Sequence, residues 1–170
     1  YKCFYTAHCF PQSYPHRFTS KKLYYWLEKS FKNTSFEYIH VSESDNREGK
    51  LACPKINSKI ILSPSRFEEP NFKNTTFHSK NILVVGSYRT QKGYDILPKI
   101  QRCLISLDSD FKIKILGTKS FGSYFKTYSW QENIKNFYLD SFCLLNVSYS
   151  EGASLAVLDA MAIGIPVFSF

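Results

Sequence analysis

The chain has 170 residues, of which 44% are hydrophobic, with 12 Tyr and 15 Phe but only 7 Gly and 7 Pro. Such a chain holds one hydrophobic core or parts of two, and its composition excludes disordered and fibrous proteins. The net charge of +8 favours anionic partners such as phosphates, acidic lipid surfaces or nucleic acid, without choosing among them. No apolar run approaches the roughly 20 residues of a membrane span, and no secretory leader is visible.

The five cysteines are odd in number and show no C-x-x-C spacing. Cys103 and Cys143 fall in apolar helix and strand patterns, so we predict that both are reduced core residues. The N-x-S/T sequon at Asn146 lies in a strand-like run, where a glycan would not fit. These features favour a reducing, cytosolic setting. The sole methionine is Met161, and residue 1 is Tyr, so we expect the chain to be part of a longer protein.

Strands and helices alternate along the chain, which predicts an α/β fold with parallel sheets and helices on their faces. In the first half, a long polar loop follows the first strand, and a helix with an apolar face follows the loop. The expected elements are strands at 2–6, 36–41 and 59–62, the loop 8–20, and a helix that includes Leu23, Trp26, Leu27 and Phe31.

The segment 65–79 has no apolar period and contains several Asn and Thr as well as Pro70. This composition is typical of a connection between domains. We therefore expect two Rossmann-like domains, at residues 1–72 and 73–170.

The second half has a Rossmann-type order of strands and helices. The link 117–122 joins two of its strands with fewer than the roughly 10 residues that a parallel crossover needs. Ser129 and Glu132 form a capping-box pattern that predicts a helix start, with inward-facing side chains at Trp130, Ile134, Phe137 and Tyr138. The expected elements are strands at 81–86, 111–115, 142–147 and 167–170, and helices at 92–107, from 129 onward, and at 151–163.

Two strand ends in this half carry polar residues directly before a helix, at 86–92 and 148–154. Ligands bind beyond the carboxyl ends of the strands in such sheets, and helix starts present unpaired N–H groups to anions. Gly152 allows a ligand to approach the backbone closely, and Lys92 adds a full positive charge. We therefore expect these loops to bind a diphosphate. Taken singly, Lys92 fits better as a solvent-exposed lysine before a glycine.

Asp159 is the only ionisable side chain between Gly152 and Phe170, and it lies on a helix that is apolar on all sides. A lone acid in such a place is costly unless a polar partner meets it. We expect that partner to be a ligand whose ribose hydroxyls donate to Asp159, with Glu151 bonding sugar hydroxyls at the rim. The alternative partner is a neighbouring backbone group.

These segments resemble the carboxyl-terminal domain of the retaining nucleotide-sugar glycosyltransferases of GT-B architecture. The specific part of the likeness is the block 151–167, which follows a strand and Ser and has Glu-Gly, an apolar helix, Gly, Pro and Val in order. The sequence GSYRTQKG matches a second pattern of the family through Gly86, Lys92 and Gly93. The sequence FYTAHCF is similar to a strand that ends in a histidine facing the donor sugar, which makes His8 a candidate. A loop histidine of no special role explains His8 equally well.

The resemblance implies an enzyme that transfers a sugar from a nucleotide-diphosphate sugar to an acceptor, with retained configuration and no metal. It also implies a GT-B two-domain architecture, incomplete here, in a cytoplasmic protein that optionally associates with the cytoplasmic face of a membrane. The acceptor would be a saccharide or a lipid-linked molecule, and no nucleic-acid partner is implied. We expect these 170 residues alone to be poorly stable and inactive. The implied catalytic residues are Glu151, Lys92 and His8, and the implied donor-binding residues are Gly86, Ser87, Arg89, Gly152, Ser154, Leu155 and Asp159.

Four features depart from the family pattern. The second acid is Asp159 in place of Glu, and Ser87 stands where the family has a phosphate-binding Arg. Arg66 replaces a glycine of the linker, and the link 117–122 lacks the family's helix. These departures leave open a degenerate domain that only binds a nucleotide or a protein partner.

Two other interpretations are weaker. Asp108 and Asp110 form a D-x-D pattern that holds a metal in another class of glycosyltransferase. The pattern lies away from the expected ligand edge, so we interpret it as a solvated helix end. Nucleic-acid binding fits the charge, but most Phe and Tyr residues occupy core positions instead of an exposed stacking row.

Overall fold

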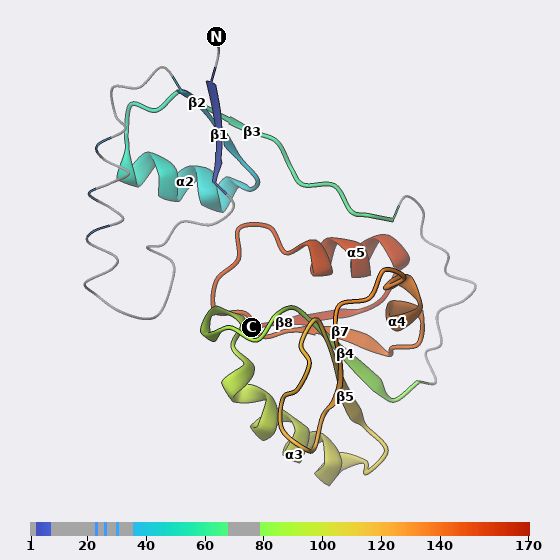
Figure 1. The fold of residues 1–170 in the computed structure, drawn as a ribbon. Helices are drawn as coiled ribbons and strands as arrows, with labels where there is room; N and C mark the ends of the chain where they lie inside the picture. The colour runs from blue at the N-terminus through green and yellow to red at the C-terminus, as the bar shows by residue number, and fades with distance from the viewer. Residues whose placement is uncertain (1–2, 8–22, 24–25, 27–29, 31–35, 68–78) are drawn as a thin grey trace. The chain divides into compact units, whose positions relative to one another are not determined.

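The computed structural model describes residues 3–7, 23, 26, 30, 36–67 and 79–170. The chain divides into two compact units, Tyr1–Pro64 with Ser150–Ser154, and Ser65–Tyr149 with Leu155–Phe170. Each unit contains a parallel sheet with helices beside it (Figure 1). The predicted α/β class with parallel, Rossmann-like sheets is therefore confirmed. The expected domain limits at residues 72 and 73 stay a prediction.

In the first unit, three parallel strands lie in the order β1-β2-β3, and α2 connects β2 to β3. The sequence pattern does not predict α2, because this helix has too few apolar residues to show a helical period. Its signal is the N-cap, because the Ser42 side chain accepts a hydrogen bond from the Asp45 N–H at 3.1 Å. The elements are β1 (Cys3–Ala7), β2 (Phe36–His40), α2 (Glu43–Ala52) and β3 (Ser58–Ile60).

Part of the helix expected around Trp26 is described. Leu23, Trp26 and Ser30 are helical, and the Ser30 hydroxyl donates to the Trp26 carbonyl at 2.9 Å. Both Leu23 and Trp26 are more than half exposed. Leu27 and Phe31 lie outside the described residues.

In the second unit, five parallel strands lie in the order β6-β5-β4-β7-β8, with β4 at the centre. The apolar run of β4 fits this central place, because such a strand is covered on both faces. The strands are β4 (Asn81–Val85), β5 (Lys112–Leu116), β6 (Lys126–Tyr128), β7 (Cys143–Asn146) and β8 (Val167–Ser169).

Helices cover both faces of this sheet (Figure 1). Ile82 and Val84 of β4 belong to the core cluster shared with Leu97 of α3 (Leu97–Leu107). Leu83, which points to the opposite face, belongs to the cluster formed with α4 (Lys135–Leu139) and α5 (Leu155–Ile163). The alternation of side chains along β4 therefore divides the core into two layers.

The helix expected at 92–107 begins later than predicted. Two 3-10 turns, η4 (Thr90–Lys92) and η5 (Tyr94–Ile96), precede α3, which starts at Leu97. Gly93, at φ +64°, separates the two turns in a left-handed conformation that ends helical hydrogen bonding.

The capping-box prediction at Ser129 is wrong. The helix α4 begins at Lys135, its N-cap is Ile134, and no side chain caps it. Trp130 is 66% exposed instead of inward, whereas Ile134 and Tyr138 are buried as expected. The helix begins beside Ile134, the first of its apolar side chains to be buried in the core. The start therefore follows the packing of the core and not the capping pattern at Ser129.

The link between β5 and β6 contains no helix, although these strands are parallel neighbours. Two aromatic side chains of the link fill part of the space that a crossover helix would cover. Phe125 is buried, and its ring centroid lies 5.1 Å from that of Phe121. Phe121 in turn packs edge-on against Tyr94 at 5.4 Å.

The described cysteines, Cys3, Cys53, Cys103 and Cys143, are all free. Cys143 is buried as predicted, and burial raises the pKa of its thiol to about 11. The prediction that Cys103 belongs to the core is wrong, because this side chain lies on the exposed side of α3.

Candidate functional site

Gly86 directly follows β4 and lies at the carboxyl edge of the sheet. Its φ of +150° is one that side-chain-bearing residues rarely adopt, and a Cβ there would lie 3.5 Å from both Lys92 Cε and the Tyr94 hydroxyl. The end of the Lys92 side chain therefore lies beside the end of β4. Tyr94, which is almost fully buried, donates its hydroxyl to the Gly86 carbonyl at 2.6 Å and holds this backbone in place.

The loops after β4 and β7 meet at Gly93. A Cβ on Gly93 would lie 1.9 Å from the Val147 carbonyl oxygen, so only glycine fits there. Tyr149 reinforces the contact, since its N–H donates to the Gln91 carbonyl at 2.9 Å. The two loops that the sequence analysis selected are therefore neighbours up to Tyr149.

Tyr149 also bonds through its side chain. Its hydroxyl donates to Asp95 Oδ2 at 2.6 Å, and this hydrogen bond raises the pKa of the Tyr149 phenol. The β7 loop is thus attached to the β4 loop by one backbone and one side-chain hydrogen bond. Tyr149 is not among the site residues predicted from the sequence.

Ser87 and Arg89, two predicted donor-binding residues, are exposed in the β4 loop. Between them, Tyr88 is 63% exposed, and its ring lies 5.3 Å from that of Phe121. The loop therefore offers a hydroxyl, a guanidinium and an aromatic face to solvent, next to the half-buried Lys92.

Glu151, Gly152 and Ser154 lie in the loop between β7 and α5, and all three are partly exposed. The expected helix start at Glu151 is wrong, because α5 begins at Leu155. The free N–H groups of a helix start therefore belong to the residues around Leu155. The expected approach of Glu151 to Lys92 stays a prediction.

Asp159 has no exposed surface, and the protein itself supplies its polar partners. Its Oδ1 accepts from the Ser65 hydroxyl at 3.0 Å and from the Arg66 backbone N–H at 2.8 Å. Its Oδ2 accepts from Arg66 Nε at 2.8 Å and from Arg66 Nη2. The lone acid on an apolar helix therefore has a cationic partner, as its burial requires. The expected contact of Asp159 with a ribose stays a prediction.

The same segment is fixed on both sides of Arg66. Ser65 Oγ accepts from the Phe67 N–H at 3.0 Å, and the Phe67 ring lies 5.9 Å from the ring of Tyr138. Lys135 Nζ lies 5.8 Å from the Phe67 ring centroid. Burial, with a contribution from the Asp159 charge, raises the pKa of Tyr138, so this hydroxyl stays neutral.

Arg66 and Asp159 were both noticed in the sequence, but as separate departures from the family pattern. They lie 93 positions apart, so no local pattern joins them. The sequence offers one indication that the two residues pair. An acid, Asp159, and a cation, Arg66, each stand where the family pattern has a different residue.

Two predicted features lie elsewhere. His8 is outside the described residues. Asp108 accepts from Lys80 Nζ at 2.5 Å, and Asp110 accepts from it at 3.4 Å, so the D-x-D pattern forms an exposed ion-pair cluster. The neighbouring Lys80 lowers the pKa of Asp108. Within the described part of the chain, no group of three His, Cys, Asp or Glu side chains is arranged to hold a metal.

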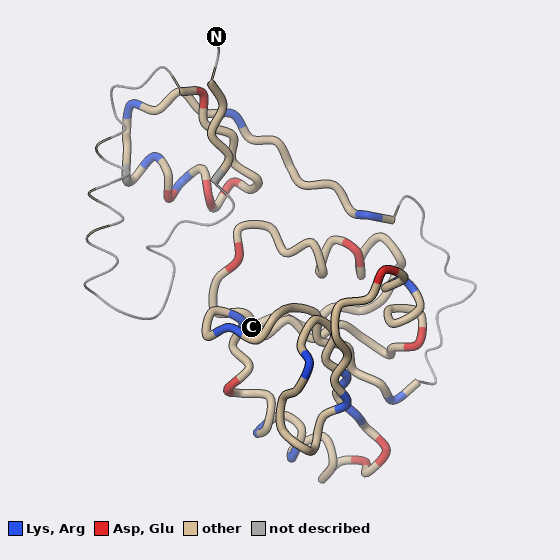
Figure 2. The backbone as a smooth tube through the Cα atoms, viewed as in Figure 1, with Lys and Arg blue, Asp and Glu red and all other residues tan. Residues whose placement is uncertain are grey.

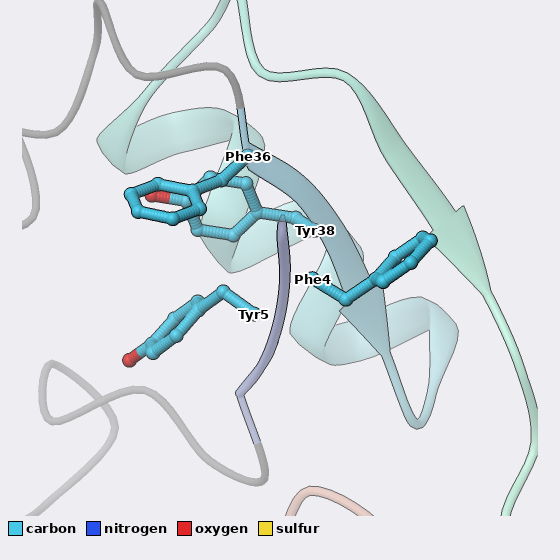
Figure 3. Close-up of a pocket in the computed structure, with 4 residues that line it drawn as sticks. All are labelled: Phe4, Tyr5, Phe36 and Tyr38. Carbon is cyan, nitrogen blue, oxygen red and sulfur yellow. The ribbon is translucent and has the colours of Figure 1, made fainter. Parts of the chain in front are cut away.

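The first unit contains an apolar pocket of about 160 Å³ on β1 and β2, lined by Phe4, Tyr5, Phe36 and Tyr38. Figure 3 shows Tyr5, Phe36 and Tyr38 on one side of the strands and Phe4 on the other. The rings of Tyr5 and Tyr38 meet edge-on at 5.2 Å. These side chains offer no charge to a diphosphate.

Charged residues are dispersed over the described backbone, with basic and acidic positions interleaved in both units (Figure 2). None of the helices in the described part of the chain is both long and apolar enough to cross a membrane.

No protein-family model matches the chain. Over 178 residues the chain is 26% identical to an uncharacterized glycosyltransferase of Haemophilus influenzae, with 96% of this chain and 50% of that protein aligned. Over 190 residues it is 24% identical to an uncharacterized 41.2 kDa protein in the cps region of Klebsiella pneumoniae, with 99% of this chain and 52% of that protein aligned. The chain therefore spans about half the length of the curated relatives it matches.

Solved structures share the fold. TarM superposes with a TM-score of 0.80 at 14% identity, over 99% of this chain and 36% of that one. WaaG, a glycosyltransferase involved in lipopolysaccharide biosynthesis, gives 0.76 at 17% identity, over 98% of this chain and 55% of that one. Anabaena Alr3699/HepE, solved in complex with UDP and glucose, gives 0.72 at 14% identity, over 99% of this chain and 52% of that one.

Proposed function

Because this chain has the fold of GT-B glycosyltransferases and is similar to an uncharacterized glycosyltransferase along nearly its whole length, we propose that the intact protein is a glycosyltransferase. It transfers a sugar from a nucleotide-diphosphate donor to an acceptor with retention of configuration. The main support for this proposal is the position of the Lys92 side chain. Its side chain lies beside Gly86 at the end of β4, where the loop after β7 joins the same edge through Gly93.

The chemistry needs stabilisation of the negative charge that builds on the departing diphosphate. Lys92 supplies a full cation, and the free N–H groups at the start of α5, around Leu155, supply partial positive charge. Gly86, Ser87 and Arg89 contribute to the phosphates from the β4 loop. Glu151, Gly152 and Ser154 surround the sugar, with Glu151 orienting its hydroxyls. His8 would face the same sugar.

The donor belongs to the nucleoside diphosphate sugars, and UDP-sugars are the first probes because a structural neighbour was solved with UDP and glucose. A saccharide or a lipid-linked acceptor completes the reaction. A cytoplasmic location, at the membrane face for a lipid-linked acceptor, belongs to the same proposal.

The substitution Lys92→Ala tests this assignment. We expect kcat to fall about 100-fold or more in the intact protein, because removal of one preorganised charge-stabilising group costs about that much. Lys99→Ala is the matched control, since Lys99 is an exposed lysine of α3. Turnover that is unchanged in Lys92→Ala would contradict the role of Lys92.

Calorimetric titration with a panel of nucleotide sugars tests the donor class independently of turnover. Micromolar binding of one nucleotide sugar, with turnover, supports the enzyme. The same binding without turnover on any acceptor would instead indicate a degenerate domain that only binds nucleotide. If no nucleotide sugar binds, the proposed function is wrong.

A further inference from the structure

The carboxylate of Asp159 has no capacity left for another donor. A carboxylate has about four lone-pair sites, two on each oxygen. Ser65 Oγ and the Arg66 N–H fill those of Oδ1, while Arg66 Nε and Nη2 fill those of Oδ2. With the side chain fully buried, no face of this acid is open to solvent or to a ligand.

All four donors come from two consecutive residues. Arg66 binds through its backbone and in the bidentate side-chain mode that makes Arg–carboxylate pairs strong and geometrically specific. A ligand hydroxyl that replaced one of these donors would have to break a buried ion pair, which leaves an uncompensated charge. The neighbouring contacts of Phe67 with Tyr138 and Lys135 hold the same segment in place.

Arg66 itself remains accessible, because its side chain is 38% exposed. Arg66 is therefore partly exposed, while the acid that it binds is enclosed.

We propose that Asp159 is a positioning residue that holds Arg66 and accepts no hydrogen bond from the ribose of the donor. This inference rests on the proposed function. It follows that removing the ribose hydroxyls costs the bound nucleoside diphosphate no hydrogen bond to Asp159.

The direct test uses the unsubstituted intact protein and calorimetric titration with UDP and with 2′,3′-dideoxy-UDP. If another base binds more tightly in the panel, that nucleoside diphosphate and its dideoxy form replace them. We expect the two dissociation constants to differ by less than threefold. A dideoxy form that binds tenfold more weakly or worse would overturn the inference and leave the proposed function intact.

Arg66→Ala provides the second test, because it exposes Asp159 to the ligand. In the folded variant, the affinity for the nucleoside diphosphate should rise at least fivefold relative to the affinity for its dideoxy form. Arg102→Ala, at an exposed arginine of α3, should change neither dissociation constant. An unchanged ratio in folded Arg66→Ala would also overturn the inference.

If no nucleoside diphosphate binds, the proposed function fails, and thermal unfolding then decides the role of the pair. The double variant should lower Tm by less than the sum of the two shifts caused by Arg66→Ala and Asp159→Asn alone, because the pair acts as one unit. Additive shifts would show that Asp159 does not position Arg66.

Discussion

Gly93 is the single residue on which the meeting of the two strand-end loops depends most. Gly93→Ala should destabilise the protein by more than the roughly 1–2 kcal/mol of a left-handed alanine, because the Val147 carbonyl occupies the site of the new Cβ. Gly122→Ala is the matched control, since Gly122 has a similar φ of +60° but its Cβ would meet only Phe125 at 3.5 Å. Urea unfolding measures both, and equal losses would contradict the steric explanation.

His40 is the residue from which we expect a pH dependence. Burial, together with the positive charge of Lys50, lowers the pKa of His40 from its ordinary 6.5. The folded state therefore favours the neutral imidazole, so the stability from His40 is complete above pH 6.5 and is lost as the pH falls through its lower folded pKa. Urea unfolding from pH 8 to pH 5 should show a declining free energy of unfolding. His40→Gln should make the free energy of unfolding depend less on pH. An unchanged slope in this variant would contradict the role of His40.

The link between β5 and β6 contains packed aromatic side chains and no helix. Phe125→Ala should cost about 3–5 kcal/mol, as large-to-small substitutions of buried Phe do. Tyr124→Ala is the adjacent control, since Tyr124 is 84% exposed and surface substitutions usually change stability by about 0.5 kcal/mol or less. Urea unfolding compares the two, and a small loss for Phe125→Ala would show that the link does not support the sheet.

The elements also show which predictions the sequence permits. Strands such as β4 and β7 were predictable because their apolar runs between polar loops are too short for a helix, which favours a buried strand. The helix α2 was missed because it is almost entirely polar, and α3 and α4 start later than predicted because local patterns compete with the reach of side chains to the core. The two strand-end loops of the candidate site could be predicted from the parallel order. The partner of Asp159 could not, because the fold brings Arg66 to it across 93 positions.

The chain spans about half the length of its curated relatives. We predict that the 170-residue polypeptide alone is poorly stable and does not transfer sugar, whereas the intact protein does. A turnover assay on both, at equal concentration and with thermal unfolding of each, checks this. Robust transfer by the 170 residues alone would contradict the prediction.

The Arg66–Asp159 pair has a consequence for the order in which the protein is made. Ser65 and Arg66 begin the second unit, while Asp159 lies in its last helix. During synthesis the arginine leaves the ribosome long before the acid exists, so the contact closes only after α5 has emerged. A growing chain that stops short of α5 therefore lacks this buried ion pair, and Arg66 has no carboxylate partner in α5 until that helix has been made.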